Sequence, residues 1–112
     1  LLTLTEEQPN VAAVLNALGV AESRLAGFED SAKAHFQNAA IADAARSDSL
    51  INLAALLRAQ RDLDGAERAL SDAQRRTPAD PRVFVQLALI ALDHARNAEA
   101  IEHFERAREL HS

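Results

Sequence analysis

The side chains best able to perform chemistry in this sequence are its four histidines, His35, His94, His103 and His111. Two zinc ligands on one helix face lie about four residues apart, and no two of these histidines have that spacing. Glu99 and His103 do have it, which favours a weak side-chain pair on a helix surface. We therefore expect packing or surface roles for the histidines and no metal site.

Nucleophilic and cofactor chemistry has equally little support. The chain contains no cysteine, which excludes disulfides, thiolate ligands and a thiol nucleophile. No serine lies in a Gly-x-Ser-x-Gly motif, and the three glycines form no phosphate-binding loop. The pairs Glu6–Glu7 and Arg75–Arg76 are typical of solvated chain ends and of helix ends. We expect no catalytic residue, no cofactor and no enzymatic activity.

Charge and hydropathy exclude two further classes of partner. The sequence carries 17 acidic against 12 basic side chains, a net charge of -5, whereas nucleic-acid-binding proteins usually present a basic face. The longest apolar stretch, residues 83–92, is far shorter than the roughly 20 residues that cross a bilayer. We expect a soluble protein without nucleic-acid binding or membrane insertion. The lack of cysteine leaves cytoplasm and periplasm equally open, and a first residue other than methionine predicts a piece of a longer chain.

The elements that position these side chains are predicted to be helices throughout. Alanine and leucine, two of the best helix formers, supply 25 and 16 of the 112 residues, and only three glycines and three prolines are present. The fold class is therefore predicted to be all-α.

A repeat of 34 residues organises these helices. At this offset six apolar pairs coincide: Leu50 with Phe84, Leu53 with Leu87, Ala54 with Ala88, Ala66 with Ala100, Leu70 with Phe104, and Ala73 with Ala107. The same offset relates Ala32, Phe36 and Ala39 to the middle unit. The first helix of the first unit is offset by 35 residues instead, because Leu15, Leu18 and Gly19 match Leu50, Leu53 and Ala54. This predicts one inserted residue near Ala26–Gly27.

Each repeat is predicted to hold two helices. One helix face of the middle unit follows the i, i+3, i+4, i+7 spacing, with Leu50, Leu53, Ala54 and Leu57. Ser47 and Asp80 are placed to cap the helices that follow them, and Pro81 suits a first helical position. The units are residues 9–46, 47–80 and 81–112. Residues 1–8 are either the remnant of a preceding repeat helix or an amino-terminal cap.

The sequence resembles the tetratricopeptide repeat (TPR) in three features. These are a small residue late in the first helix, the pattern Ala-x3-Phe/Leu-x2-Ala in the second helix, and the period of 34 residues. The sequence departs from that family's pattern because it lacks tryptophan and tyrosine. Leu57 and Ala91 stand where tyrosine is usual, and Arg61 and Ala95 where the glycine between helices is usual. The resemblance implies an α-solenoid of antiparallel helix pairs, wound as a right-handed superhelix.

The resemblance also implies that the first helix of each unit lines a concave groove for a peptide. The candidate groove residues are Asn16, Val20, Arg24, Ile51, Asn52, Ala55, Arg58, Arg82, Val85, Gln86 and Leu89. Several are aliphatic where a solvated face would be polar, although packing against a neighbouring helix explains them nearly as well. Some family members bind a terminal carboxylate with a set of Lys, Asn and Arg residues. Only Asn52 and Arg82 match that set, so we do not expect this mode here.

The predicted function is a non-catalytic protein–protein interaction scaffold that binds a peptide or helix of a partner protein. The alternative is an internal structural segment of a longer superhelix, which spaces other domains or self-assembles through uncapped ends. The resemblance suggests bacterial secretion, pilus or polysaccharide-export systems for either mode. A non-catalytic appendage to an enzyme is a third possibility.

Overall fold

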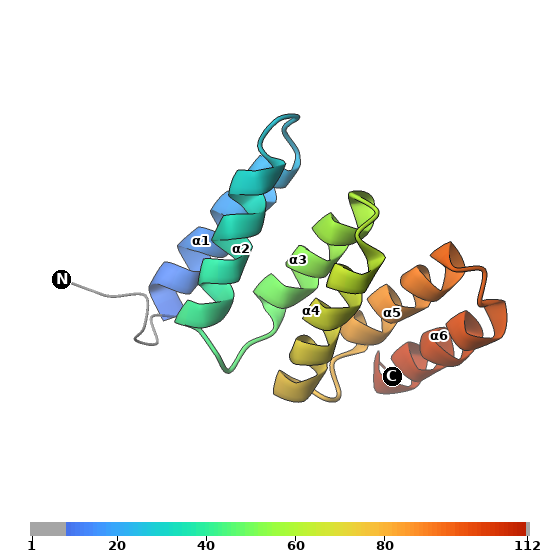
Figure 1. Ribbon diagram of the computed structural model, residues 1–112. Coiled ribbons are helices and arrows are strands. Elements are labelled where there is room, and N and C mark those ends of the chain that lie inside the picture. Colours follow the sequence, from blue (N-terminus) through green and yellow to red (C-terminus); the bar gives the residue numbers. More distant parts are fainter. Residues whose placement is uncertain (1–8, 112) are drawn as a thin grey trace.

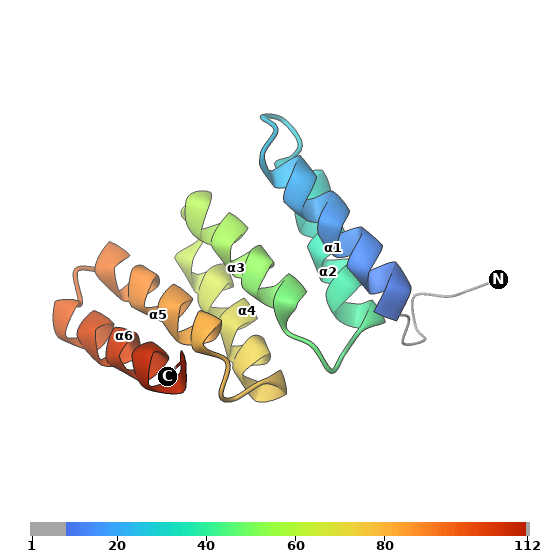
Figure 2. The same cartoon turned by 180° about the vertical axis from the view of Figure 1, so that it is seen from behind.

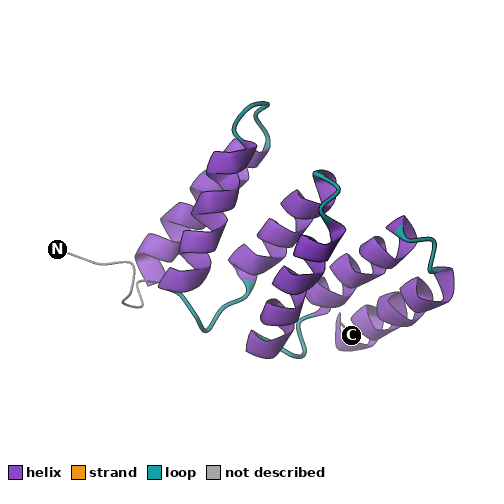
Figure 3. Cartoon of the chain, in the orientation of Figure 1, coloured by secondary structure: helices purple, strands orange, loops and turns teal. Residues whose placement is uncertain are grey.

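The structure is a computed structural model that describes residues 9–111, and within that range it consists of helices, turns and loops without a strand (Figure 3). The helices are α1 (Pro9–Ser23), α2 (Glu29–Ala42), α3 (Asp48–Ala59), α4 (Leu63–Arg76), α5 (Pro81–Asp93) and α6 (Asn97–His111). The all-α prediction is confirmed. The alternatives for residues 1–8 lie outside the described residues.

Consecutive helices form three antiparallel pairs stacked along the long axis of a molecule measuring 49 × 31 × 21 Å (Figure 1). Seen from behind, α1 lies in front of α2 and α3 in front of α4, while α5 and α6 lie side by side (Figure 2). Among the described helices the backbones of α1 and α3 and those of α3 and α5 lie close together, whereas the backbones of α2 and α4, and those of α4 and α6, lie farther apart. The α1–α3–α5 layer is the more closely packed one and hence the concave face. The predicted α-solenoid is confirmed.

Small and large residues alternate in the core as the repeat pattern predicts. Ala66, Leu70 and Ala73 of α4 are fully buried, and Ala32 and Phe36 of α2 are buried equally well. Helices approach closely where the side chain is a methyl group, and the large side chains fill the space between them at the density of a protein interior.

Helix caps agree with the sequence at one predicted position and differ at the other. Asp80 caps α5 by accepting a hydrogen bond from the Arg82 amide at 3.0 Å, with Pro81 as the first helical residue. The prediction for Ser47 is wrong, because its side chain makes no capping bond to α3. Ser47 is buried, and its hydroxyl lies 2.5 Å from that of Thr77 at the end of α4. The hydroxyl therefore joins the start of α3 to the end of α4 within one helix pair rather than capping a helix.

The turns inside the second and third pairs place residues other than glycine in the left-handed region. Arg61 has φ 67° and Ala95 has φ 59°. At the second of these turns the Arg96 amide donates to the carbonyl of Ala91 at 2.8 Å, and the Ala95 amide donates to that of Leu92 at 3.0 Å. This is the Schellman pattern, which favours glycine at the left-handed position.

Replacing Ala95 with glycine should therefore stabilise the protein. A left-handed conformation costs alanine about 1–2 kcal/mol, and glycine removes that strain. Glycine also makes the unfolded chain more flexible, which offsets about 0.4–1 kcal/mol of the gain in stability. We expect the free energy of unfolding, measured with urea, to rise by about 0.5–1 kcal/mol. As a control, Ala34→Gly at an exposed position inside α2 should lower it by about 1 kcal/mol. Equal losses in both variants would contradict this explanation.

Candidate peptide-binding face

A hollow in the concave face brings four of the predicted groove residues together. Val20 and Arg24 at the end of α1 face Asn52 and Ala55 of α3 across a space of about 250 Å³. The other residues that line it are Ser23, Phe36, Leu56 and Ala59. The hollow thus has a largely apolar lining, with one amide and one guanidinium.

The seam between α1 and α3 continues past an amide bridge into a second hollow. The Asn52 side chain donates to Oδ1 of Asn16 at 3.0 Å. Beyond Asn16 a space of about 340 Å³ is lined by alanines 12, 13 and 39 and by polar residues at the start of α3 and in the loop before it. An apolar hollow, a bridge and a more polar hollow therefore follow one another along this seam.

Two ion pairs join α3 to α5 near the same face. Arg58 Nε lies 2.7 Å from a carboxylate oxygen of Asp93, and Arg82 Nη2 lies 2.7 Å from Asp48 Oδ1 and also 2.7 Å from Asp80 Oδ2. The residues bridged between α3 and α5 are 35 and 34 apart in the sequence. Predicted groove residues Arg58 and Arg82 therefore have their charges compensated within the protein.

Acid should loosen these contacts. The pKa of Asp93 is lowered by the hydrogen bond from Arg58, and the pKa of Asp48 is also lowered, because bonds from Arg82 and Arg46 outweigh the opposing effect of burial. A carboxylate whose pKa is lower in the folded state stabilises the fold above the unfolded-state pKa near 4. That stabilisation is lost as the pH falls through the folded-state value.

We expect the melting temperature to fall as the pH is lowered below about 4. Asp93→Asn should already have a lower melting temperature at neutral pH and should lose less on acidification. Asp72→Asn is the matched control, since Asp72 pairs with Arg75 inside α4. A melting temperature that stays constant down to about pH 2 would contradict the pairing.

The remaining predicted residues lie apart from the α1–α3 hollow. Ile51 is only 6% exposed and belongs to the buried core, so it offers no groove surface. Leu89 is half-buried, and Oε1 of Gln86 is a buried oxygen without a hydrogen-bond partner among the described residues. Val85 lines a different space, at the α5–α6 end of the stack.

Phe36 and Ala59 also line the hollow and were not among the candidates. Ala59 follows Ala55 by four residues, so helical spacing would have found it. Phe36 comes from the second helix of its pair and reaches the hollow past Gly19. A Cβ built at Gly19 would lie 2.5 Å from the Phe36 ring, which shows how closely the ring passes α1.

The α5–α6 end of the stack exposes apolar side chains that are buried elsewhere. Phe104 is 38% exposed, whereas Leu70 and Phe36 at the same repeat position are at most 1% exposed. Phe104 and Val85 line a space of about 360 Å³ there. At the opposite end Val14 and Leu18 of α1 are 61% and 44% exposed.

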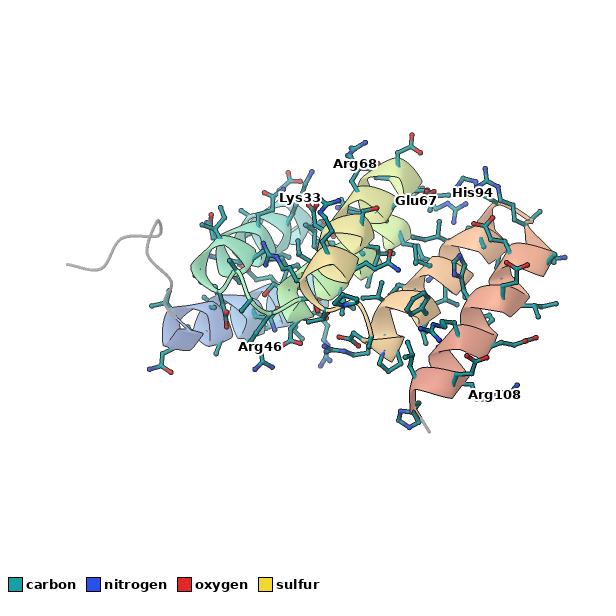
Figure 4. All side chains as sticks on the ribbon, turned by 90° about the horizontal axis from the view of Figure 1, so that it is seen from below. Lys33, Arg46, Glu67, Arg68, His94 and Arg108 are labelled. Atoms are coloured by element: carbon teal, nitrogen blue, oxygen red, sulfur yellow. The ribbon has the colours of Figure 1, made fainter. Side chains whose placement is uncertain are left out.

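Three of the histidines, His35, His94 and His103, each approach a different glutamate. His94 approaches Glu67 of α4 at 3.5 Å (Figure 4), and His103 approaches Glu99 at 3.6 Å as the spacing predicted. Within residues 9–111 no three His, Cys, Asp or Glu side chains gather as metal ligands. In that same part of the chain, none of the helices combines the length and hydropathy that crossing a bilayer requires.

Comparison with known proteins connects this arrangement to solved structures. No protein-family model and no curated protein sequence matches the chain. MamA superposes with a TM-score of 0.79 at 19% identity, over 97% of this chain and 60% of MamA, so the chain spans less than two thirds of that protein. The type III secretion translocator chaperone SycD of Yersinia enterocolitica gives 0.81 at 22% identity, over 92% and 77% of the two chains.

A third solved structure carries the repeat's name. The second TPR of Spaghetti (RPAP3), bound to an HSP90 peptide, gives a TM-score of 0.79 at 18% identity, over 91% of this chain and 94% of the other. Together with the three stacked helix pairs and their 34-residue spacing, these likenesses show that the chain has the tetratricopeptide-repeat fold.

Proposed function

We propose that the protein is a non-catalytic interaction scaffold whose concave face binds a peptide segment of a partner protein. The observation that carries the proposal is the hollow between α1 and α3, where Val20, Arg24, Asn52 and Ala55 meet. The bound segment lies along the seam, with an apolar side chain in the hollow and its backbone beside the Asn16–Asn52 bridge.

The energetics of such a site are adequate for a weak, specific complex. Full burial of one aliphatic side chain contributes about 1.5–3 kcal/mol. Two such groups and a few hydrogen bonds approach the roughly 8 kcal/mol of a micromolar complex. The peptide-bound RPAP3 repeat and the chaperone SycD, which share the fold, support a binding role.

Binding through a terminal carboxylate alone is less well supported. Arg82, one of the two residues that match the carboxylate-binding set, is already held by Asp48 and Asp80. A ligand carboxylate would have to compete with two carboxylates of the protein itself. The apolar hollow is therefore the main attachment point in this proposal.

A random peptide library displayed on phage tests the proposal without a known partner. Peptides selected on the wild-type protein are synthesised, and their affinities are measured by fluorescence anisotropy. Val20→Glu places a charge in the hollow and should weaken binding at least tenfold. Ile41→Glu, on an exposed α2 side chain, is the matched control and should bind as the wild type does. Enriched peptides that bind both variants equally would contradict the proposal.

A second candidate function, self-association through the ends of the stack, has its own observation. Phe104 is exposed where the equivalent Leu70 is covered by the following helix pair. A second copy placing Val14 and Leu18 of α1 on that end would set the first helix of one pair against the second helix of another, as α5 already lies against α4 inside the chain. Sedimentation should then show a mass that rises with concentration and falls in Phe104→Glu. A constant monomer mass would contradict this candidate.

A further inference from the structure

We propose that the segment bound between α1 and α3 carries an aliphatic side chain next to a carboxylate, and that Arg24 pairs with this carboxylate. The proposal rests on the proposed function and specifies its ligand. In this proposal Arg24 makes the site prefer acidic segments over neutral or basic ones, and the neighbouring apolar residues bind the aliphatic side chain.

Arg24 differs from the other arginines of this face because its charge is uncompensated. Arg58 pairs with Asp93, and Arg82 pairs with Asp48 and Asp80. Within residues 9–111 no acidic group pairs with Arg24, although its side chain lines the hollow. The face therefore presents one positive charge at the rim of an apolar space, which complements an acidic residue beside an apolar one.

The backbone around Arg24 is held in place although its guanidinium makes no ion pair with the residues that the structure describes. The Arg24 amide donates to the carbonyl of Ala21 at 3.2 Å, and the Ser23 hydroxyl donates to that of Val20 at 2.7 Å. The nearest acids in the sequence have other partners. Glu22 accepts bonds from Ser31 and His35, and Glu29 accepts one from the Gly27 amide.

The helix ends make Arg24 decisive for charge selection. The hollow lies beside Ser23, the last residue of α1, and Ala59, the last residue of α3. Helix C-termini carry partial negative charge, which repels an acid and attracts a base. With Arg24 present the full positive charge dominates, and without it the two ends favour a neutral or basic ligand.

The apolar part of the site suits an aliphatic side chain. Val20 is partly buried against the core, and Ala55 and Ala59 contribute methyl groups across from it. The floor is formed by Phe36 and Leu56, which are 1% and 8% exposed. Apart from Ser23 and Arg24 at the end of α1, this lining offers one polar group, the Asn52 amide, so the inserted side chain gains mainly from contact with hydrocarbon.

Parallel selections test the proposal. The same phage library is selected on the wild type, on Arg24→Glu and on Arg68→Glu, a control that reverses an exposed arginine on α4, facing away from the concave layer (Figure 4). We expect wild type and Arg68→Glu to enrich an aliphatic residue beside Asp or Glu. Arg24→Glu should instead enrich an aliphatic residue beside Lys or Arg.

Single peptides make the result quantitative. A wild-type-selected peptide should lose about tenfold in affinity for Arg24→Glu, because attraction becomes repulsion. Changing its carboxylate to lysine should restore binding to that variant. If peptides require Val20 but tolerate lysine at the acidic position in the wild type, the charge assignment is wrong and the proposed function stands. If no selected peptide requires Val20, the proposed function fails and this inference fails with it.

Discussion

Replacing Phe36 with alanine should lower the free energy of unfolding by about 3–5 kcal/mol, the usual cost of emptying a buried phenylalanine site. The same replacement at Phe104 should cost markedly less. The two phenylalanines hold the same repeat position in α2 and α6, but one is 1% exposed and the other 38%. The difference arises because the following helix pair covers Phe36, while the described chain ends its stack at α6.

Urea unfolding monitored by circular dichroism measures both values. The comparison is well controlled, since residue type, helix position and substitution are identical. Nearly equal losses of unfolding free energy in the two variants would contradict this account. They would show that the following helix pair does not bury Phe36 more deeply than Phe104 is buried at the open end of the stack.

Replacing Gly19 with alanine should destabilise the protein by about 1–3 kcal/mol through overpacking. The new Cβ would lie 2.5–3.0 Å from three atoms of the Phe36 ring, closer than real contacts allow. Helix propensity alone predicts the opposite sign, because alanine inside a helix is about 1 kcal/mol better than glycine. The sign of the change therefore separates the two effects.

A double-mutant cycle identifies Phe36 as the cause. Phe36→Leu removes ring atoms, so Gly19→Ala in that background should be tolerated far better than in the wild type. The free energies of the two single variants would then not add. An additive cycle, or a Gly19→Ala variant more stable than the wild type, would contradict the close approach of α1 and α2.

The fold could be predicted from the sequence because its signals are local or periodic. The 34-residue recurrence of Ala66, Leu70 and Ala73 marks positions that meet neighbouring helices, and the structure buries all three. Ser47 illustrates the limit. It has the residue type and location of a cap, yet its hydroxyl bonds to Thr77, 30 residues away, and that choice depends on how the start of α3 packs against the end of α4.

The candidate site was predictable only in part for the same reason. Helical spacing placed Val20, Asn52 and Ala55 on one side, but it did not show that Ile51 turns into the core. A repeat pattern assigns equal roles to equivalent residues, while burial depends on which neighbours cover each pair. The ion pair between Arg58 and Asp93 joins residues 35 apart, so a search for opposite charges near the repeat period would have found it.

Nuclear magnetic resonance mapping of a library-selected peptide on the isotope-labelled protein tests the central claim most directly. Binding in the seam predicts that the largest amide shifts fall on Val20, Asn52, Ala55 and their neighbours, with little change on the exposed face of α4 around Arg68. Shifts confined to α6 near Phe104, or spread over the outer layer, would contradict peptide binding on the concave face.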